Sequence, residues 1–163
     1  LQIIAARQIK PGDFIQLNTG EHGYVHDITW RNTTIKALTN NMVIIPNSKM
    51  ASSVITNFSE PQEELYINVE FNVNYENDLH KVEQVTLEVA EEILANTPGG
   101  VTHFKPFIRY LELLDTNIKL AVIMRGEKYV DQYVLRHEFI KKLHERYRQK
   151  GIYISGTTRP EIN

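Results

Sequence analysis

The pattern of hydrophobic and polar positions changes character near residue 60. Before that point, short apolar segments alternate with polar turns, and strands are predicted over residues 14–17, 24–30, 33–38, 42–46 and 54–58. In the second of these, we place Tyr24, His26, Ile28 and Trp30 on one face. Five short strands without a long helix between them indicate a small β-barrel of the SH3-like or Sm-like type.

The fourth predicted strand ends at a proline. Pro46 has no N–H to donate, so a regular strand stops there. Asn47 and Ser48 follow, and their side chains can bond the local backbone and begin a turn or a helix. This turn chemistry accounts for the proline and the asparagine without any catalytic role, so we expect Pro46→Ala to weaken assembly or folding.

After a polar linker at residues 59–64, the pattern becomes that of an α/β domain. Apolar and polar residues alternate over 65–73, which predicts a strand with one buried face. Asn77 and Asp78 then provide an N-cap for a helix whose apolar positions run from Leu79 to Ile93, and Pro98 and the glycines after it end that helix. Residues 107–114 and 118–124 are predicted to form a hairpin.

A second helix is predicted over residues 129–149, ending at Gly151, with a final strand at residues 152–154. We assign its buried stripe to apolar or aromatic positions at helical spacing: Val130, Tyr133, Val134, His137, Ile140, Leu143 and Tyr147. The order β-α-β-β-α-β is that of a ferredoxin-like domain. The prediction is therefore an α+β chain with a β-domain at residues 9–60, a ferredoxin-like domain at 61–155, a short start at 1–8 and a polar tail at 156–163.

Composition narrows the classes of function. The net charge is −2, and neither half of the chain is strongly basic, which argues against nucleic acid as a partner. The chain has no cysteine, so it has no disulfide, thiolate metal site or cysteine nucleophile. The longest apolar run, residues 120–124, is far shorter than the ~20 residues that cross a bilayer.

No candidate for a catalytic, cofactor or metal site emerges from the motifs. His137 and His144 lie seven residues apart on the second predicted helix, whereas helical metal pairs are typically four apart. Glu91 and Glu92 point about 100° apart on a helix, so they do not share a catalytic gap. An enzyme is therefore not expected, and Trp30 and Phe58 are each expected in the core.

Several segments, in order, carry a family resemblance. Residues 9–15 (IKPGDFI), Gly23-Tyr24-Val25 with Ile28, residues 33–36 (TTIK), residues 43–48 (VIIPNS) and residues 57–59 (NFS) resemble the β-domain of small-conductance mechanosensitive channels. The following ferredoxin-like pattern extends the resemblance to about residue 155. On these matches, the family-motif positions are Pro11, Gly12, Asp13, Gly23, Val25, Thr34, Pro46, Asn47, Ser48 and Asn57.

The resemblance implies the cytoplasmic vestibule of a channel that releases ions and small osmolytes on hypo-osmotic shock. In the family such chains assemble as a homo-heptamer on the cytoplasmic side of the inner membrane, where they contribute to assembly, solute filtering and gating support. Of the membrane part, only residues 1–7 resemble the end of a pore-lining helix, so we expect membrane attachment through upstream helices absent from this chain. A soluble binding module, holding RNA or a small ligand, is the alternative; a hydrolase using the histidines is a weaker third.

Overall fold

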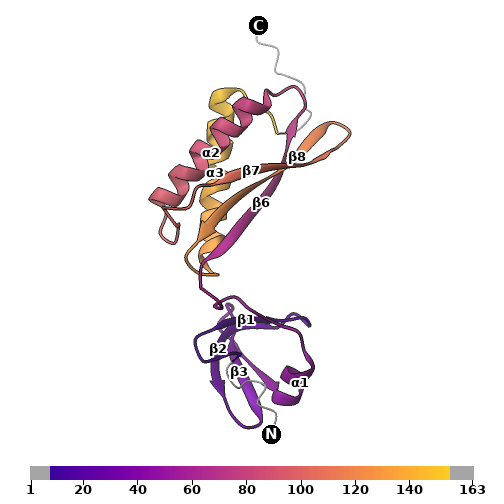
Figure 1. The fold of residues 1–163 in the computed structure, drawn as a ribbon, viewed down its shortest axis with the longest axis vertical. Coiled ribbons are helices and arrows are strands. Elements are labelled where there is room, and N and C mark those ends of the chain that lie inside the picture. Colours follow the sequence, from indigo (N-terminus) through magenta and orange to yellow (C-terminus); the bar gives the residue numbers. More distant parts are fainter. Residues whose placement is uncertain (1–7, 155–163) are drawn as a thin grey trace. The chain divides into compact units, whose positions relative to one another are not determined.

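The computed structural model describes residues 8–154, so the predictions for residues 1–7 and for the polar tail lie outside the described residues. The chain divides into two compact units, Leu1–Glu63 and Glu64–Asn163 (Figure 1). The mixed α+β fold class is confirmed. Within the described part, no helix combines the length and the apolar character that a bilayer crossing needs.

The first unit is a five-stranded antiparallel sheet with one short helix. Its elements are β1 (Phe14–Leu17), β2 (His22–Ile28), β3 (Asn32–Lys36), β4 (Met42–Pro46), α1 (Asn47–Ser52) and β5 (Ile55–Asn57). The strand order is β4-β3-β2-β1-β5, so all five predicted strands are confirmed. The five strands do not close into a barrel, because β4 and β5 lie at opposite edges of the sheet and no ladder joins them in the described residues. After Pro46 the chain turns at once into α1, and the three-residue β5 pairs with β1 alone.

The core of the first unit lies between the sheet and α1, which is short but contributes one fully buried side chain, Met50. The apolar residues that pack together here come from every strand except β5, with Ile9 added from the segment before β1: Ile9, Ile15, Leu17, Val25, Ile35, Ile45 and Met50. The segment predicted as a plain connector is therefore a packing element.

The predicted face of β2 is wrong because the strand contains an irregularity. Its pairing with β3 shifts register between Val25 and Asp27, which breaks the period of two. Val25 is buried, whereas Trp30 lies beyond the strand and is 86% exposed, so the core assignment of Trp30 is also wrong. Phe58 is half-buried, with its ring centroid 6.1 Å from that of Phe14.

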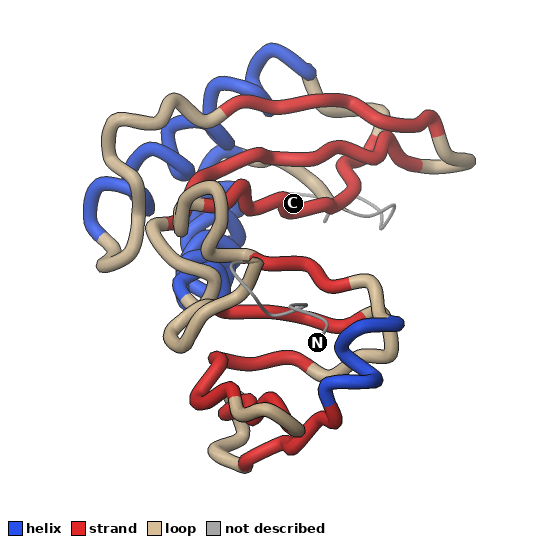
Figure 2. Tube along the Cα trace, turned by 60° about the horizontal axis from the view of Figure 1, so that its bottom comes forward, coloured by secondary structure: helices blue, strands red, loops and turns tan. Residues whose placement is uncertain are grey.

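The second unit is a three-stranded antiparallel sheet with two helices on one face (Figure 1). Its elements are β6 (Leu65–Asn74), α2 (Leu79–Asn96), β7 (Phe107–Leu113), β8 (Asn117–Gly126) and α3 (Asp131–Lys150), in the sheet order β6-β8-β7. The predicted N-cap of α2 is confirmed, since the Asp78 carboxylate accepts a hydrogen bond of 2.9 Å from the His80 N–H. Figure 2 shows the helices in blue and the strands in red.

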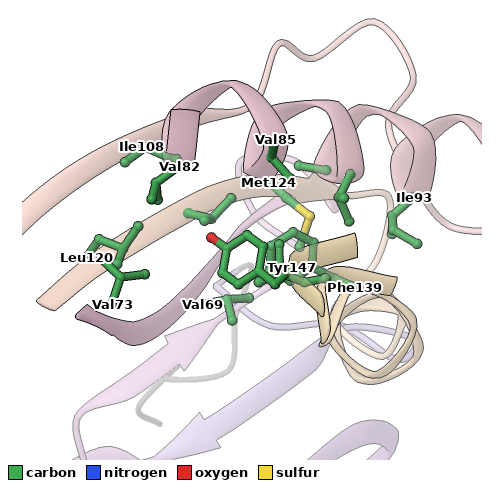
Figure 3. Close-up of a cluster of buried hydrophobic side chains, with 14 of the residues drawn as sticks. Val69, Val73, Val82, Val85, Ile93, Ile108, Leu120, Met124, Phe139 and Tyr147 are labelled. Carbon is green, nitrogen blue, oxygen red and sulfur yellow. The ribbon is translucent and has the colours of Figure 1, made fainter. Parts of the chain in front are cut away.

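The buried stripe of α3 differs from the prediction. Leu135, Phe139, Leu143 and Tyr147, spaced four apart, face the core, as the close-up of Phe139 and Tyr147 shows (Figure 3). Tyr133, Val134 and Ile140 are about half exposed. Both stripes share Leu143 and Tyr147, but the helix is rotated so that Leu135 and Phe139 are covered fully.

The predicted last strand is wrong. Gly151 ends α3 with φ of 68°, and residues 152–154 continue without strand pairing. Tyr153 makes one strand-like contact, accepting 3.0 Å from the Asn74 N–H at the end of β6. Its own N–H donates to Asn77 Oδ1 at 3.1 Å instead of to β6, so the side chain of Asn77 takes the bond that would continue a ladder.

Candidate functional site

Three of the positions predicted from the resemblance, Asp13, Asn47 and Asn57, lie in two hydrogen-bonded clusters of the first unit. The Asn57 cluster, defined as Gln8, Lys10, Asp13, Asn57 and Ser59, joins the start of the unit to its end. Asn57 Nδ2 donates to the Gln8 carbonyl and to Asp13 Oδ2, both at 3.0 Å, and Asn57 Oδ1 accepts from the Ser59 N–H at 2.9 Å. Asp13 Oδ2 also accepts from the Lys10 N–H at 3.0 Å.

Because the Asp13 carboxylate is buried, loss of its hydrogen-bond donors would destabilise the first unit. Asp13 is only 4% exposed, and a buried carboxylate requires hydrogen-bond donors. Asn57 supplies one of those donors from a position 44 residues further along the chain. The cluster therefore fixes where the chain enters the unit relative to where it leaves it.

The Pro11-Gly12-Asp13 turn is anchored on β2. Gly12 N–H donates to the Val25 carbonyl, and Val25 N–H donates to the Asp13 carbonyl, both at 2.8 Å. Gly12 has φ of 95°, a conformation that favours glycine. Pro11 is exposed, and its contribution is the preset geometry of the turn.

The Asn47 cluster, defined as Thr29, Thr33 and Asn47, ties the end of β4 to the β2–β3 turn. Thr33 Oγ1 donates to Asn47 Oδ1, and Asn47 Nδ2 donates to the Thr29 carbonyl, both at 2.8 Å. The Asn47 backbone N–H donates to the Arg31 carbonyl, also at 2.8 Å. Asn47 therefore holds the chain on the β2–β3 turn at the point where β4 ends, while α1 begins without a side-chain cap.

Three of the predicted positions, Thr34, Pro46 and Ser48, lie near the Asn47 cluster but are not part of it. Thr34 lies on β3 opposite Ile44, and its neighbour Thr33, completely buried, makes the contact. Strand alternation could have identified Thr33, which shares a face with the buried Ile35. Pro46 ends β4, and Ser48 is exposed in the first turn of α1.

Close packing between two strands explains why a glycine stands at position 23. A Cβ at this position would lie 2.4 Å from the Lys36 carbonyl oxygen on the neighbouring strand β3. No ordinary Cβ contact is that short, so a side chain here would push the two strands apart. Gly23 thus allows β2 and β3 to approach each other.

An ion pair that the sequence did not predict ties the β1–β2 loop to α1. Lys49 Nζ lies 2.5 Å from Glu21 Oε1, and the Thr19 hydroxyl also donates to the Glu21 carboxylate. These bonds, that from Lys49 above all, lower the pKa of Glu21 to about 2. The pair adds a third connection across the first unit.

The described residues do not bring together side chains in an arrangement typical of a catalytic or metal site. They contain no group of three His, Cys, Asp or Glu side chains placed to hold a metal ion. His137 is largely exposed and lies near Glu138 on its own helix. Burial raises the pKa values of Tyr110 and Tyr147, which pack as structural side chains. The hydrogen-bonded clusters support a role in positioning the chain within the first unit.

Comparison with known proteins identifies the first unit. Residues 1–60 match the model of the mechanosensitive ion channel β-domain. The chain is 26% identical to the large-conductance mechanosensitive channel MscMJLR of Methanocaldococcus jannaschii, over 97% of this chain and 44% of that protein. The chain is similar to mechanosensitive channels along nearly its whole length. The predicted resemblance is therefore confirmed, and the alternative of a soluble binding module is not favoured.

Further relatives and solved structures match along nearly the whole chain. The small-conductance channel MscMJ of Methanocaldococcus jannaschii is 23% identical over 96% of this chain and 44% of its own length. The closed-state crystal structure of Helicobacter pylori MscS gives a TM-score of 0.74 at 19% identity, over 99% of this chain and 61% of that one. Arabidopsis thaliana MSL1 gives 0.66 at 18% identity, over 95% and 56%. The chain spans about half the length of the curated relatives it matches.

Proposed function

We propose that this chain forms the cytoplasmic vestibule of an MscS-type mechanosensitive channel that releases ions and small osmolytes on hypo-osmotic shock. The observation that carries the proposal is the match of residues 1–60 to the channel β-domain, followed by a second unit that the same relatives also cover. The pore and the tension-sensing surface would belong to segments upstream of this chain. Its place would be the cytoplasmic side of the cell's inner membrane.

The Asn57 cluster supports a mechanical role for the β-domain. A channel vestibule must transmit the position of an upstream pore helix to the rest of the subunit. Residue 8 is where the described chain begins, and its carbonyl is held by Asn57 close to the exit of the unit. A displacement of the upstream helix would therefore act on the entry and exit of the β-domain together, which suits gating support.

Two open sheet edges support self-association. β4 and β5 both end the sheet without a further strand among the described residues, and edges of this kind are templates for pairing. Ile44 on β4 and Val54 beside β5 are each more than 60% exposed. We propose that copies of this unit contact one another along these edges in a homo-heptamer, with ions and osmolytes, and no nucleic acid, as the other partners.

The test is an electrical recording on the longer parent chain. Parent protein containing the upstream segments, reconstituted in liposome patches, is expected to give current that rises with membrane tension. Asn57→Ala should shift the tension threshold or the rate of closing, whereas Asn41→Ala, an exposed turn substitution, should not. A parent chain that inserts and assembles but conducts nothing under tension would contradict the proposal.

A further inference from the structure

The sheet of the second unit has a hollow on the face that α2 and α3 do not cover. On β6, Ile67 and Val69 pack into the core beneath the helices, so the residues that alternate with them point to the other face. These residues and side chains of β7 and β8 line a hollow of about 390 Å³, named here the sheet hollow. Its floor is Ala121, which pairs with Glu70 on β6 and with Arg109 on β7. The small side chain of Ala121 gives the hollow its depth.

Large apolar side chains surround the sheet hollow. Tyr66 on β6 is 63% exposed, and Leu111 on β7 is 48% exposed. Phe107 and Ile123 are half-buried and complete the walls. A single exposed apolar residue needs no explanation, but these four lie together on three adjacent strands. Apolar surface gathered in this way is typical of a contact site.

Helix α3 carries a second apolar row beside the one that it buries. The stripe expected from the sequence included Tyr133 and Ile140, and these side chains are 49% and 51% exposed. They lie seven residues apart, which is two helical turns, with the exposed His137 between them. These three residues are named here the α3 ridge. The expected helical pattern is therefore present, but it does not face the core of its own unit.

We propose that the α3 ridge of one copy of this chain packs into the sheet hollow of the next copy. The hollow and the ridge are different surfaces of one unit, so the contact is head-to-tail, and each copy can meet two neighbours. Contacts of this kind generate a ring when the rotation from copy to copy closes. The inference rests on the homo-oligomer proposed above, and it names the surfaces through which the second units meet.

The dimensions of the two surfaces agree. Strands β6 and β7 lie on either side of β8, so their axes are about 9.6 Å apart, twice the usual strand spacing of ~4.8 Å. A helix with its side chains is about 10–12 Å across. A helix lying over β8 therefore reaches both walls of the hollow and places its central row above Ala121. Helix on sheet is also one of the common ways in which two layers pack.

The charges beside the two surfaces are compatible. On the rim of the hollow, the Arg109 guanidinium lies over its own neighbour Phe107, 4.6 Å from the ring centroid, which leaves Glu70 as the carboxylate facing the hollow. At about 100° per residue, Arg136 and Lys141 lie about 70° to either side of the α3 ridge. Because a cation stands on each flank of the ridge, a helix lying in the hollow in either direction brings one of them toward Glu70.

Paired cysteines test the contact, since the chain has no cysteine of its own. Leu111→Cys places a thiol at the hollow and Ile140→Cys places one at the ridge. The two positions lie on different faces of their own unit, so a short bis-maleimide linker between them joins two copies. In the parent protein assembled in liposomes, the double variant should give a ladder of cross-linked species, and neither single variant should give any.

A control pair shows whether the linking is specific. Leu111→Cys combined with Glu88→Cys, an exposed position on α2, should give no ladder. No ladder from the Leu111→Cys, Ile140→Cys double variant would overturn the proposal. A cross-linked pair from Leu111→Cys alone would show that two hollows face each other, and would overturn it as well.

Filling the hollow tests its place in the contact. Ala121→Leu adds bulk on the face away from the core, so with both cysteines present the yield of cross-links should fall about tenfold. Thr116→Leu, in the exposed turn between β7 and β8, should leave the yield unchanged. Equal yields from the two variants would overturn the assignment of the hollow as the contact site.

Recording currents from the same liposomes separates this contact from the proposed function. Cross-links without any current under tension would support the contact and reject the channel role. Current under tension without cross-links in the double variant would reject the contact alone. A parent chain that stays monomeric would reject both.

Discussion

Replacing Asn57 by alanine should destabilise the first unit more than the same replacement of Asn18 or Asn41. The change removes three hydrogen bonds: those to the Gln8 carbonyl, to Asp13 Oδ2 and from the Ser59 N–H. It also leaves the nearly buried Asp13 carboxylate with one fewer donor. The strands themselves are not altered, because the side chain is replaced by a smaller one.

The magnitude can be worked from the bonds lost. Two neutral hydrogen bonds contribute roughly 1 kcal/mol each, and one to a charged group roughly 1.5–3 kcal/mol. We therefore expect a loss of about 3.5–5 kcal/mol in the free energy of unfolding. This is a large share of the roughly 5–15 kcal/mol that stabilises a typical domain, so the first unit of the variant should unfold at far lower denaturant concentration.

The other two asparagines calibrate the measurement. Asn18 accepts one bond of 3.2 Å from the Val54 N–H, so Asn18→Ala should cost about 1 kcal/mol. Asn41 is exposed, and its side chain makes no hydrogen bond in the described part of the chain, so Asn41→Ala should stay within about 0.5 kcal/mol of the original. Urea unfolding followed by NMR signals of each unit separately avoids treating a two-unit chain as two-state.

The ranking of the three variants by loss of unfolding free energy tests whether the Asn57 cluster stabilises the first unit. A cost for Asn57→Ala no larger than that for Asn41→Ala would show that the Asn57 cluster does not stabilise the unit. A loss of signals from both units at one urea concentration would instead show that the two units unfold together.

Three further predictions concern close approach and charge. Gly23→Ala should cost about 1–3 kcal/mol, because its Cβ would meet the Lys36 carbonyl oxygen, and thermal unfolding measures this. Lys49→Met should return the pKa of Glu21 from about 2 toward 4.5 in an NMR titration; because the folded-state pKa is the lower one, the stability that the pair contributes is present above pH 4.5 and is lost as the pH falls toward 2. Tyr110, whose pKa is raised to about 12 by burial, should form tyrosinate late in an absorbance titration, and its contribution should be complete below pH 10 and be lost as the pH rises toward 12.

The positions of the strands and helices could be predicted because local chemistry decides them. Pro46 ends β4 whatever the tertiary context, and the carboxylate of Asp78 caps α2 through bonds to the next few residues. Alternation over β6 predicted its buried side chains because one face of that strand meets the helices. Each of these features depends on residues close together in the sequence.

The errors arose where distant parts of the chain decide the outcome. The irregularity in β2 is visible only in its pairing with β3, and it reverses the face on which later residues lie. The rotation of α3 about its axis depends on the core space between the sheet and α2. The side chains of Leu135 and Phe139 fill that space. Local helical spacing allowed both stripes, so the sequence alone could not choose between them.

The motif positions were predicted from resemblance, and the structure gives several of them a physical role that local patterns could not. Asn57 and Asp13 are 44 residues apart, and only the pairing of β1 with β5 brings them within 3.0 Å. Asn47 and Thr33 meet through the pairing of β3 with β4 in the same way. In both clusters an asparagine side chain bonds a main-chain carbonyl and a second side chain, a task that needs a donor and an acceptor on one short group. An aspartate at either position would lack the N–H donor, and an alanine would lack both the donor and the acceptor, so hydrogen bonding accounts for the choice of asparagine.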